Sequence, residues 1–292
     1  MLKMLFDITG IDPTKISLDD KETMSIFTGT DALGVTSEQI NSEVATYGVP
    51  EFGTKFVRNM LIEAKPRTFE ELVKISGLAH GTGTWLYNAQ DLINEGIIEL
   101  KDTISTRDDI MIYLIQKGLP IEKAFDIMET VRKGKALKEL DKWNEFKEIM
   151  KQYDVPNWYI ESCEKIKYLF PKAHAVGYVI NAFRIAWYKV HKPKAFYAVY
   201  FTIRANWSNE LKQILVQNEK QLFIDKIQEL ENKDLNDITM EERNLIYDLQ
   251  IAIEMYERGI KFLPADLEKS DSTKCLLEEV GIRLPLIVID KE

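Results

Sequence analysis

Apolar residues recur every three or four positions along most of the chain, which is the period of an amphipathic helix. The segment from Thr54 to Lys65 is typical, because its apolar residues share one face and Pro66 ends the pattern. Thr68 and Glu71 then have the spacing of a capping box, which predicts the start of the next helix. The chain is therefore expected to be built mainly from helices.

Two interruptions of the helical period shape the rest of the prediction. Gly77 is expected to end the helix that starts at Thr68, and the segment His80-Gly81-Thr82-Gly83 then forms a loop that presents backbone N–H groups before a helix containing Trp85. Thr239 and Glu242 form a second capping box. Further helices are predicted at 105–117, 120–133, 136–152, 157–169, 171–192, 194–204, 208–230 and 239–258.

The last stretch, 262–289, mixes Pro, Gly and short apolar runs such as Leu286-Ile287-Val288-Ile289. Short runs of this kind predict a small β-containing piece or connector. The expected fold class is therefore mainly α, with a small C-terminal α/β connector.

Composition excludes several classes of protein. With 292 residues and 45% hydrophobic content, the chain can bury a sizeable core. Cys163 and Cys275 are its two cysteines and have no partner at metal-ligand spacing, so neither a disulfide framework nor a zinc site is expected. The sequence shows no signal-peptide pattern and no apolar run long enough to cross a bilayer, so we expect a soluble, cytoplasmic protein without membrane contact.

Charge is distributed unevenly. The chain has a net charge of −9, yet the stretch from Lys165 to Asn209 contains no Asp or Glu. Its basic residues form what we call the basic strip, and aromatic residues lie between them. A strip of this kind should attract a polyanion, and a phosphorylated one is the obvious candidate. The members of the basic strip are Lys165, Lys167, Lys172, Arg184, Lys189, Lys192, Lys194 and Arg204.

The predicted helix between Pro171 and Pro193 carries two contrasting faces. A turn of 100° per residue places Val179, Phe183 and Trp187 on one face, which is expected to be buried. The opposite face carries His174, Gly177, Tyr178, Asn181, Arg184 and Tyr188. Lys172 lies in the first turn, where unpaired N–H groups and the helix dipole favour an anion. The pattern is compatible with a phosphate-binding face and also with an ordinary solvated face.

Several segments resemble the C-family replicative DNA polymerases, above all the PolC-type polymerase III α subunit. The resemblance lies in the order and residues of four blocks, which cover most of the first 205 residues. These blocks are Leu5-Phe6-Asp7-Ile8-Thr9-Gly10-Ile11-Asp12-Pro13, the stretch from Val49 to Arg58 with Ile75 to Thr82, the run Phe170-Pro171-Lys172-Ala173-His174-Ala175-Val176-Gly177-Tyr178 with Arg184 to Trp187, and Ala198 to Ala205.

The resemblance implies a polymerase fingers-like helical domain. It places Lys172, His174 and Arg184 where basic groups of the family face the incoming dNTP, and Tyr178 near its sugar and base. It places Ser76, His80, Gly81 and Thr82 at the nucleotide base pocket. It leaves Lys165, Lys167, Lys192, Lys194 and Arg204 as candidate DNA contacts. Gly83 departs from the family, which usually has Asp at that position.

The resemblance also implies what lies outside the chain. The expected segments are 1–48 as the end of the palm and the palm–fingers connector, 49–262 as helical fingers, and 263–292 as a connector toward a missing duplex-binding region. The palm aspartates that hold Mg²⁺ in the full-length polymerase are not matched here. No catalytic residue or metal ligand is therefore expected in this chain, and the isolated chain should be an inactive part of a DNA-directed DNA polymerase. Expected partners are the DNA primer-template, a dNTP, the remaining polymerase domains and the sliding clamp.

Two other classes remain open on the sequence. A non-catalytic helical scaffold, such as a split or decayed polymerase paralogue, could use the basic strip to bind nucleic acid or an acidic protein. A small-molecule enzyme built on His80 and His174 is less favoured, because no nucleophile and base have a recognisable spacing.

Overall fold

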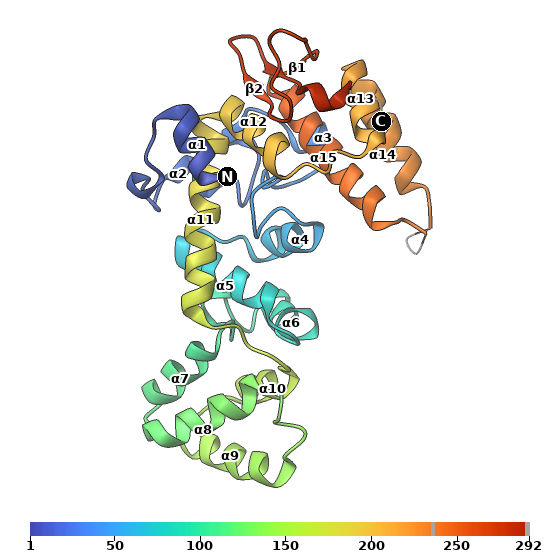
Figure 1. Cartoon of the computed structure of the whole chain (residues 1–292). Coiled ribbons are helices and arrows are strands. Elements are labelled where there is room, and N and C mark those ends of the chain that lie inside the picture. The colour runs from blue at the N-terminus through green and yellow to red at the C-terminus, as the bar shows by residue number, and fades with distance from the viewer. Residues whose placement is uncertain (235–236, 290–292) are drawn as a thin grey trace. The chain divides into compact units, whose positions relative to one another are not determined.

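A computed structural model describes residues 1–234 and 237–289 (Figure 1). Residues 235–236 and 290–292, which belong to the ranges expected for the fingers and the connector, lie outside the described residues. The chain divides into two compact units, one formed by Met1–Gly53 with Ala182–Glu292 and the other by Thr54–Asn181. These units do not coincide with the three expected segments, whose assignment to palm, fingers and connector stays a prediction.

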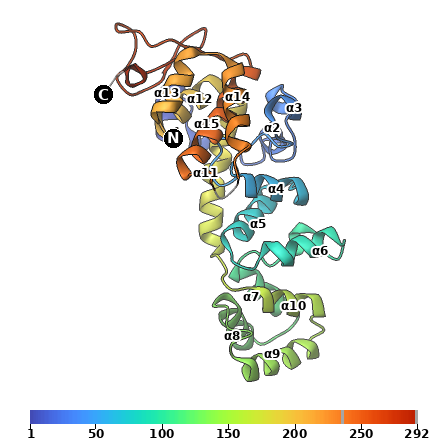
Figure 2. The same cartoon turned by 90° about the vertical axis from the view of Figure 1, so that its right-hand side faces the viewer.

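The second unit, Thr54–Asn181, consists of short helices around an apolar core. In both views α7 to α10 gather in one group (Figures 1 and 2). Their core includes Ile110, Leu114, Ile127 and Trp143, and the Trp143 indole donates a hydrogen bond of 2.8 Å to Glu164 Oε1. The helices are α4 (Lys55–Ala64), α5 (Phe69–His80), α6 (Gln90–Asn94), α7 (Arg107–Gln116), α8 (Ile121–Arg132), α9 (Leu140–Gln152) and α10 (Asn157–Lys165), with a 3₁₀ turn at Leu100–Asp102.

Helix α11 (Lys172–His191) begins in the second unit and ends in the first. The first unit also contains α1 (Leu2–Thr9), α2 (Lys21–Ser25), α3 (Ser37–Ile40), α12 (Pro193–Ile203), α13 (Asn209–Gln217), α14 (Lys220–Glu231) and α15 (Met240–Glu257). Short 3₁₀ helices lie at Pro13–Lys15, Asp31–Leu33 and Leu286–Val288. A three-stranded sheet of β1 (Phe262–Leu263), β2 (Leu276–Leu277) and β3 (Ile282–Arg283) follows in the order β1-β3-β2. Ile282 pairs with Phe262 in the parallel ladder and with Leu277 in the antiparallel one.

A buried ion pair lies at the centre of the first unit. Lys189 and Glu254 are both 0% exposed and their charged atoms are 2.8 Å apart. Lys189 Nζ also donates to the backbone oxygens of Ala45 and Tyr47, at 2.7 and 2.6 Å, and Glu254 accepts from the Tyr197 hydroxyl at 2.6 Å. Because every charged atom has partners, the pair ties α11, α15 and α12 together without leaving a bare buried charge.

Most predicted helices are confirmed, and the fold is mainly α. Thr54 caps α4 by accepting from Val57 N, and Thr239 and Glu242 form the predicted capping box of α15. Thr68 caps α5 as predicted, but Glu71 accepts from Arg67 N and so completes only half of a box. The described helices include none that combines the length and apolarity of a membrane crossing.

Three predictions about the elements are wrong. Helix α5 continues through Gly77 to His80, and the residues around Trp85 form an irregular turn, Trp85–Ala89, with φ 59° at Tyr87. The predicted helix at 208–230 is two helices, because Asn218 adopts a left-handed conformation with φ 57°. The small β-containing piece predicted for 262–289 is confirmed by the sheet of β1, β2 and β3, and Leu286–Val288 within it form a 3₁₀ helix.

Candidate functional site

Four rings gather in the second unit where α5 ends and α11 begins. Phe170 is central: its ring centroid lies 4.8 Å from that of His80, 6.0 Å from that of His174 and 6.2 Å from that of Tyr178. The rings of His80 and Tyr178 are within about 26° of parallel to Phe170, whereas His174 meets it edge-on. His80, His174 and Tyr178 are exposed, and Tyr178 is 47% exposed. We call these four residues the aromatic cluster.

The aromatic cluster joins three residues that the sequence singled out separately. His80 was assigned to the loop after α5, and His174 and Tyr178 to the outer face of α11. Their meeting depends on Phe170, which sequence reasoning did not select as a site residue. An exposed stack of nearly parallel rings is a surface on which a planar group can stack.

Gly177 lies on α11 between His174 and Tyr178. It is exposed, and a Cβ added there would meet no atom within 4 Å. Packing within the chain therefore does not explain a glycine in this helix, where it costs about 1 kcal/mol relative to alanine. The open space leaves the backbone accessible to a ligand.

The first turn of α11 differs from the prediction. The Lys172 backbone N–H donates to the carboxylate of Asp108 at 3.0 Å, so a carboxylate of the chain already occupies that part of the helix N-terminus. The prediction of unpaired N–H groups open to a phosphate is wrong for Lys172. The sequence could not show this, because Asp108 comes from α7, far away in the chain. The Lys172 side chain lines a separate cavity, described below.

The loop after α5 also uses its backbone groups within the chain. Gly81 N donates to Gly77 O, and Thr82 N donates to Tyr168 O, both at 3.0 Å. Thr82 O accepts from Tyr168 N at 3.3 Å, which completes an antiparallel bridge, and also from Lys167 N at 2.8 Å. The N–H groups of Gly81 and Thr82 are therefore not open to a ligand, contrary to the prediction for this loop.

Ser76 and Gly83 lie on either side of that loop in sequence. Ser76 is 2% exposed and its hydroxyl has no hydrogen-bond partner. Gly83 has φ +72°, and a Cβ there would lie 2.2 Å from the backbone oxygen of Lys165. This close approach and the positive φ explain why glycine occupies the position in this chain.

In the first unit, Arg184 is half-buried, and its Nε atom is buried without a hydrogen-bond partner. Hydrogen bonds from Thr14 lower the pKa of Asp12, and the positive charge of Arg184 adds to this effect. Arg184 thus lies near one carboxylate and still has unused hydrogen-bonding capacity. Phe183 is fully buried and stacks on Phe27 with ring centroids 6.2 Å apart, as expected for the apolar face.

Tyr188 and Lys189 correct the sequence-based description of α11. Tyr188 was placed on the exposed face, but it is fully buried and its hydroxyl donates to Ile11 O at 2.6 Å. Lys189 was counted in the basic strip, but its ion pair with Glu254 is fully buried. The basic strip is therefore weaker than the sequence indicated.

The remaining candidate DNA contacts differ in their surroundings. Within the second unit, Lys167 is exposed, and Lys165 Nζ donates to Tyr87 O at 2.8 Å. Within the first unit, Lys192 and Arg204 are exposed, and Lys194 donates to Glu279 O. A carbonyl partner leaves the charge of a lysine available, so all five residues can attract phosphate.

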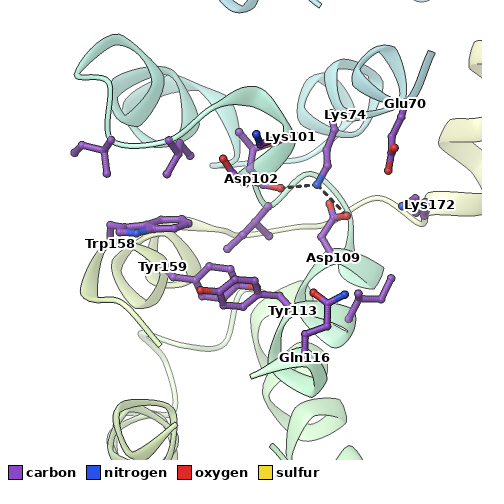
Figure 3. A pocket seen from close by; sticks show the side chains of 15 residues that line it. Glu70, Lys74, Lys101, Asp102, Asp109, Tyr113, Gln116, Trp158, Tyr159 and Lys172 are labelled. Carbon is purple, nitrogen blue, oxygen red and sulfur yellow. Dashed lines mark hydrogen bonds and ion pairs between the residues drawn. The ribbon is translucent and has the colours of Figure 1, made fainter. Parts of the chain in front are cut away.

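The second unit contains a cavity that sequence reasoning missed (Figure 3). Its volume is about 580 Å³, and its lining includes Tyr113, Trp158, Tyr159 and Lys172. On one side Lys74 pairs with Asp109 at 3.0 Å, and both side chains are about one-tenth exposed. Burial raises the pKa of Asp109, but Lys74 and hydrogen bonds from Ser105 and Thr106 outweigh it and leave the pKa below its usual value.

Within residues 1–234 and 237–289, no three His, Cys, Asp or Glu side chains gather as the ligands of one metal ion.

Comparison with known proteins identifies the family. The family model of the bacterial DNA polymerase III alpha subunit finger domain matches residues 1–154. The chain is 54% identical over 98% of its length to the DNA polymerase III PolC-type of Caldanaerobacter subterraneus subsp. tengcongensis, and 52% identical over 98% to that of Clostridium perfringens. It is 50% identical over 95% to that of Bacillus subtilis. The chain spans about one-fifth of the length of each relative. Since the finger-domain match covers more than half of the chain, the chain belongs to the bacterial DNA polymerase III alpha subunit finger domain family, and the relatives it resembles are of the PolC type.

Proposed function

We propose that this chain acts as the fingers region of a replicative DNA polymerase and contacts the incoming dNTP and the primer-template during DNA replication. The observation that supports nucleotide contact best is the aromatic cluster, in which exposed rings of α5 and α11 stack beside the open backbone of Gly177. Stacking of a base on such rings is sequence-tolerant, because every base has a π-face. A replicative polymerase needs that tolerance.

Within the second unit we assign separate roles to the members of the aromatic cluster. Tyr178 and His80 present ring faces for the base or sugar, and Phe170, whose ring stacks with both, fixes their spacing. His174 is exposed and presents ring nitrogens that can donate to a phosphate oxygen. Gly81 and Thr82 then act by shaping the loop rather than by offering their N–H groups, which are already used.

Arg184, in the first unit, is proposed by itself as a phosphate-contacting residue. Its Nε is buried, but the residue as a whole is only half-buried, so part of the side chain remains accessible to a phosphate. Guanidinium groups bind phosphate oxygens with short, charge-assisted hydrogen bonds. In phosphoryl-type transfer such groups stabilise the charge of the triphosphate.

Contacts to the primer-template are proposed for Lys165, Lys167, Lys192, Lys194 and Arg204. Their expected contribution is electrostatic and independent of sequence, so it should weaken steeply as salt rises. The chemical step would use Mg²⁺ held by the palm of the full-length polymerase, whose other domains and sliding clamp would be further partners. The residues described here would position and neutralise the nucleotide.

Nucleotide binding by the 292-residue chain tests the proposal. A fluorescent dNTP is titrated into the wild type and into Tyr178→Ala and His174→Ala, in the presence of primer-template. Loss of one stacking ring typically costs about 1–3 kcal/mol, so Tyr178→Ala should weaken binding by about fivefold to 150-fold. Tyr168→Ala is the matched control, because Tyr168 is a similarly exposed tyrosine of the second unit outside the aromatic cluster. Equal dNTP affinity of the wild type and Tyr178→Ala would count against the proposal.

A further inference from the structure

The cavity of the second unit has the size and lining of a small-molecule site (Figure 3). Its volume of about 580 Å³ falls in the range of natural ligand pockets, about 300–1,000 Å³. Residues of α5, α7 and α10 line it together with the segment from Ile97 to Ile104 and with Lys172. His80, His174 and Tyr178 do not line it.

An aromatic wall closes one side of the cavity. Tyr113 of α7 stacks on Tyr159 of α10 with ring centroids 4.1 Å apart and an angle of 15° between the rings (Figure 3). Trp158 meets Tyr159 edge-on, with centroids 5.5 Å apart. Ile97 and Ile112 add exposed apolar surface to the same lining. A wall of this composition favours a flat, largely apolar group.

Tyr159 supplies a polar group that the chain itself does not satisfy. The residue is 1% exposed, yet its hydroxyl is buried without a hydrogen-bond partner. Burial raises its pKa well above the usual value, so the hydroxyl stays protonated at neutral pH. A buried hydroxyl left without a partner costs about 1–3 kcal/mol. The chain covers this hydroxyl, so a ligand in the cavity must displace neighbouring atoms to accept its hydrogen bond, and it would then recover part of that cost.

Charges around the cavity balance. Lys74, Lys101 and Lys172 are offset by three carboxylates, those of Glu70, Asp102 and Asp109. Lys74 and Asp109 are paired with each other, and Lys101 pairs with Glu99 at 2.7 Å. The lining therefore offers no excess charge to attract a phosphate or a cation. A neutral ligand fits it better than an ion.

We propose that this cavity binds a neutral planar heterocycle of nucleobase size, with its ring against the aromatic wall and a carbonyl oxygen or ring nitrogen accepting from Tyr159. The proposal goes beyond nucleotide contact at the aromatic cluster, because it uses other residues and excludes the phosphates. The base can come from a free nucleoside or from an unpaired position of single-stranded DNA, and the two sources share the same ring chemistry.

Binding of a deoxynucleoside to the 292-residue chain tests the proposal. Thymidine and deoxyadenosine, which carry no phosphate, are titrated calorimetrically into the wild type and into Tyr159→Phe. The substitution removes only an unsatisfied hydroxyl, so the thermal midpoint should stay unchanged or rise. Loss of one hydrogen bond should weaken nucleoside binding about threefold to tenfold. Tyr87→Phe is the matched control, because Tyr87 is 79% exposed and does not line the cavity.

Two further comparisons separate the outcomes. If an oligothymidylate displaces bound thymidine and an abasic oligonucleotide does not, the base comes from single-stranded DNA. If neither oligonucleotide displaces thymidine, the cavity binds free nucleosides. No nucleoside binding at millimolar concentration, or equal affinity in the wild type, Tyr159→Phe and Trp158→Leu, would overturn the proposal. Nucleoside binding that is lost in Tyr178→Ala and kept in Tyr159→Phe would also overturn it, while supporting the function proposed for the aromatic cluster.

Discussion

Asp248 of α15 should make the stability of the first unit depend on pH in an unusual direction. It is 3% exposed, and burial raises its pKa from 3.8 to about 6, although it accepts hydrogen bonds from Tyr200 and from Asn206 N at 2.7 and 2.9 Å. Because the folded state holds this proton more tightly than the unfolded state, the contribution of Asp248 to stability is fully present below about pH 4. It is lost as pH rises through about 6. At 1.36 kcal/mol per pKa unit, the loss by neutral pH is on the order of 3 kcal/mol.

Replacement of Asp248 by Asn isolates this effect, because Asn resembles the protonated carboxyl at every pH. The free energy of unfolding is measured with urea at pH 4 and pH 7 for the wild type and for Asp248→Asn. We expect similar values at pH 4 and a relative gain of about 3 kcal/mol for the variant at pH 7. Asp141→Asn, at an exposed position of α9, is the control for the added amide. An unchanged difference between wild type and Asp248→Asn at the two pH values would refute the reasoning.

Three further predictions concern stability and activity. Lys74→Met leaves Asp109 buried without its partner and should lower the free energy of unfolding, measured with urea, by about 3–5 kcal/mol. Recovery of that stability in the double variant with Asp109→Asn would confirm the pairing. Gly83→Ala should lower the free energy of unfolding by at least about 1–3 kcal/mol, since the φ of Gly83 is +72° and the added Cβ would meet Lys165 O. Gly177→Ala should instead raise the free energy of unfolding by up to about 1 kcal/mol. Thermal midpoints of both glycine variants check this, and a destabilised Gly177→Ala would contradict it. The isolated chain should extend no primer with Mg²⁺, because two-metal catalysis needs the palm carboxylates; nucleotide incorporation by the purified chain would contradict the assignment.

The sequence predicted those parts of the fold whose signals are local. Thr68 and Thr239 mark helix starts by capping, and each lies where a helix begins. Gly77 misled the prediction, because its role is to let α5 pack closely: a Cβ there would lie 2.7 Å from Ser105 O. Asn218 did carry a usable signal, since asparagine tolerates the left-handed conformation that separates α13 from α14.

The sequence predicted the exposure of candidate residues better than it predicted their contacts. His174 and Tyr178 are exposed on α11 as the helical period predicted. The burial of Lys189 was not predictable from that period, because its partner Glu254 comes from α15 and no local pattern announces it. The capping of Lys172 N by Asp108 likewise depends on two helices meeting. Nonlocal partners of this kind decide which charges of a basic strip remain available.

Helix α11 is proposed to combine a structural face with residues that contact the nucleotide, and substitutions of two neighbouring residues separate these roles. Arg184→Ala and Phe183→Ala are made in a full-length PolC-type polymerase that contains this segment, and nucleotide incorporation kinetics are measured alongside thermal unfolding. Arg184→Ala should fold normally and lower kcat/KM by an amount equivalent to about 2–4 kcal/mol, the usual cost of losing a charged phosphate contact. Phe183→Ala should instead lose about 3–5 kcal/mol of stability, because Phe183 is fully buried against Phe27. The claim is contradicted if Arg184→Ala incorporates nucleotides as the wild type does, or unfolds as readily as Phe183→Ala.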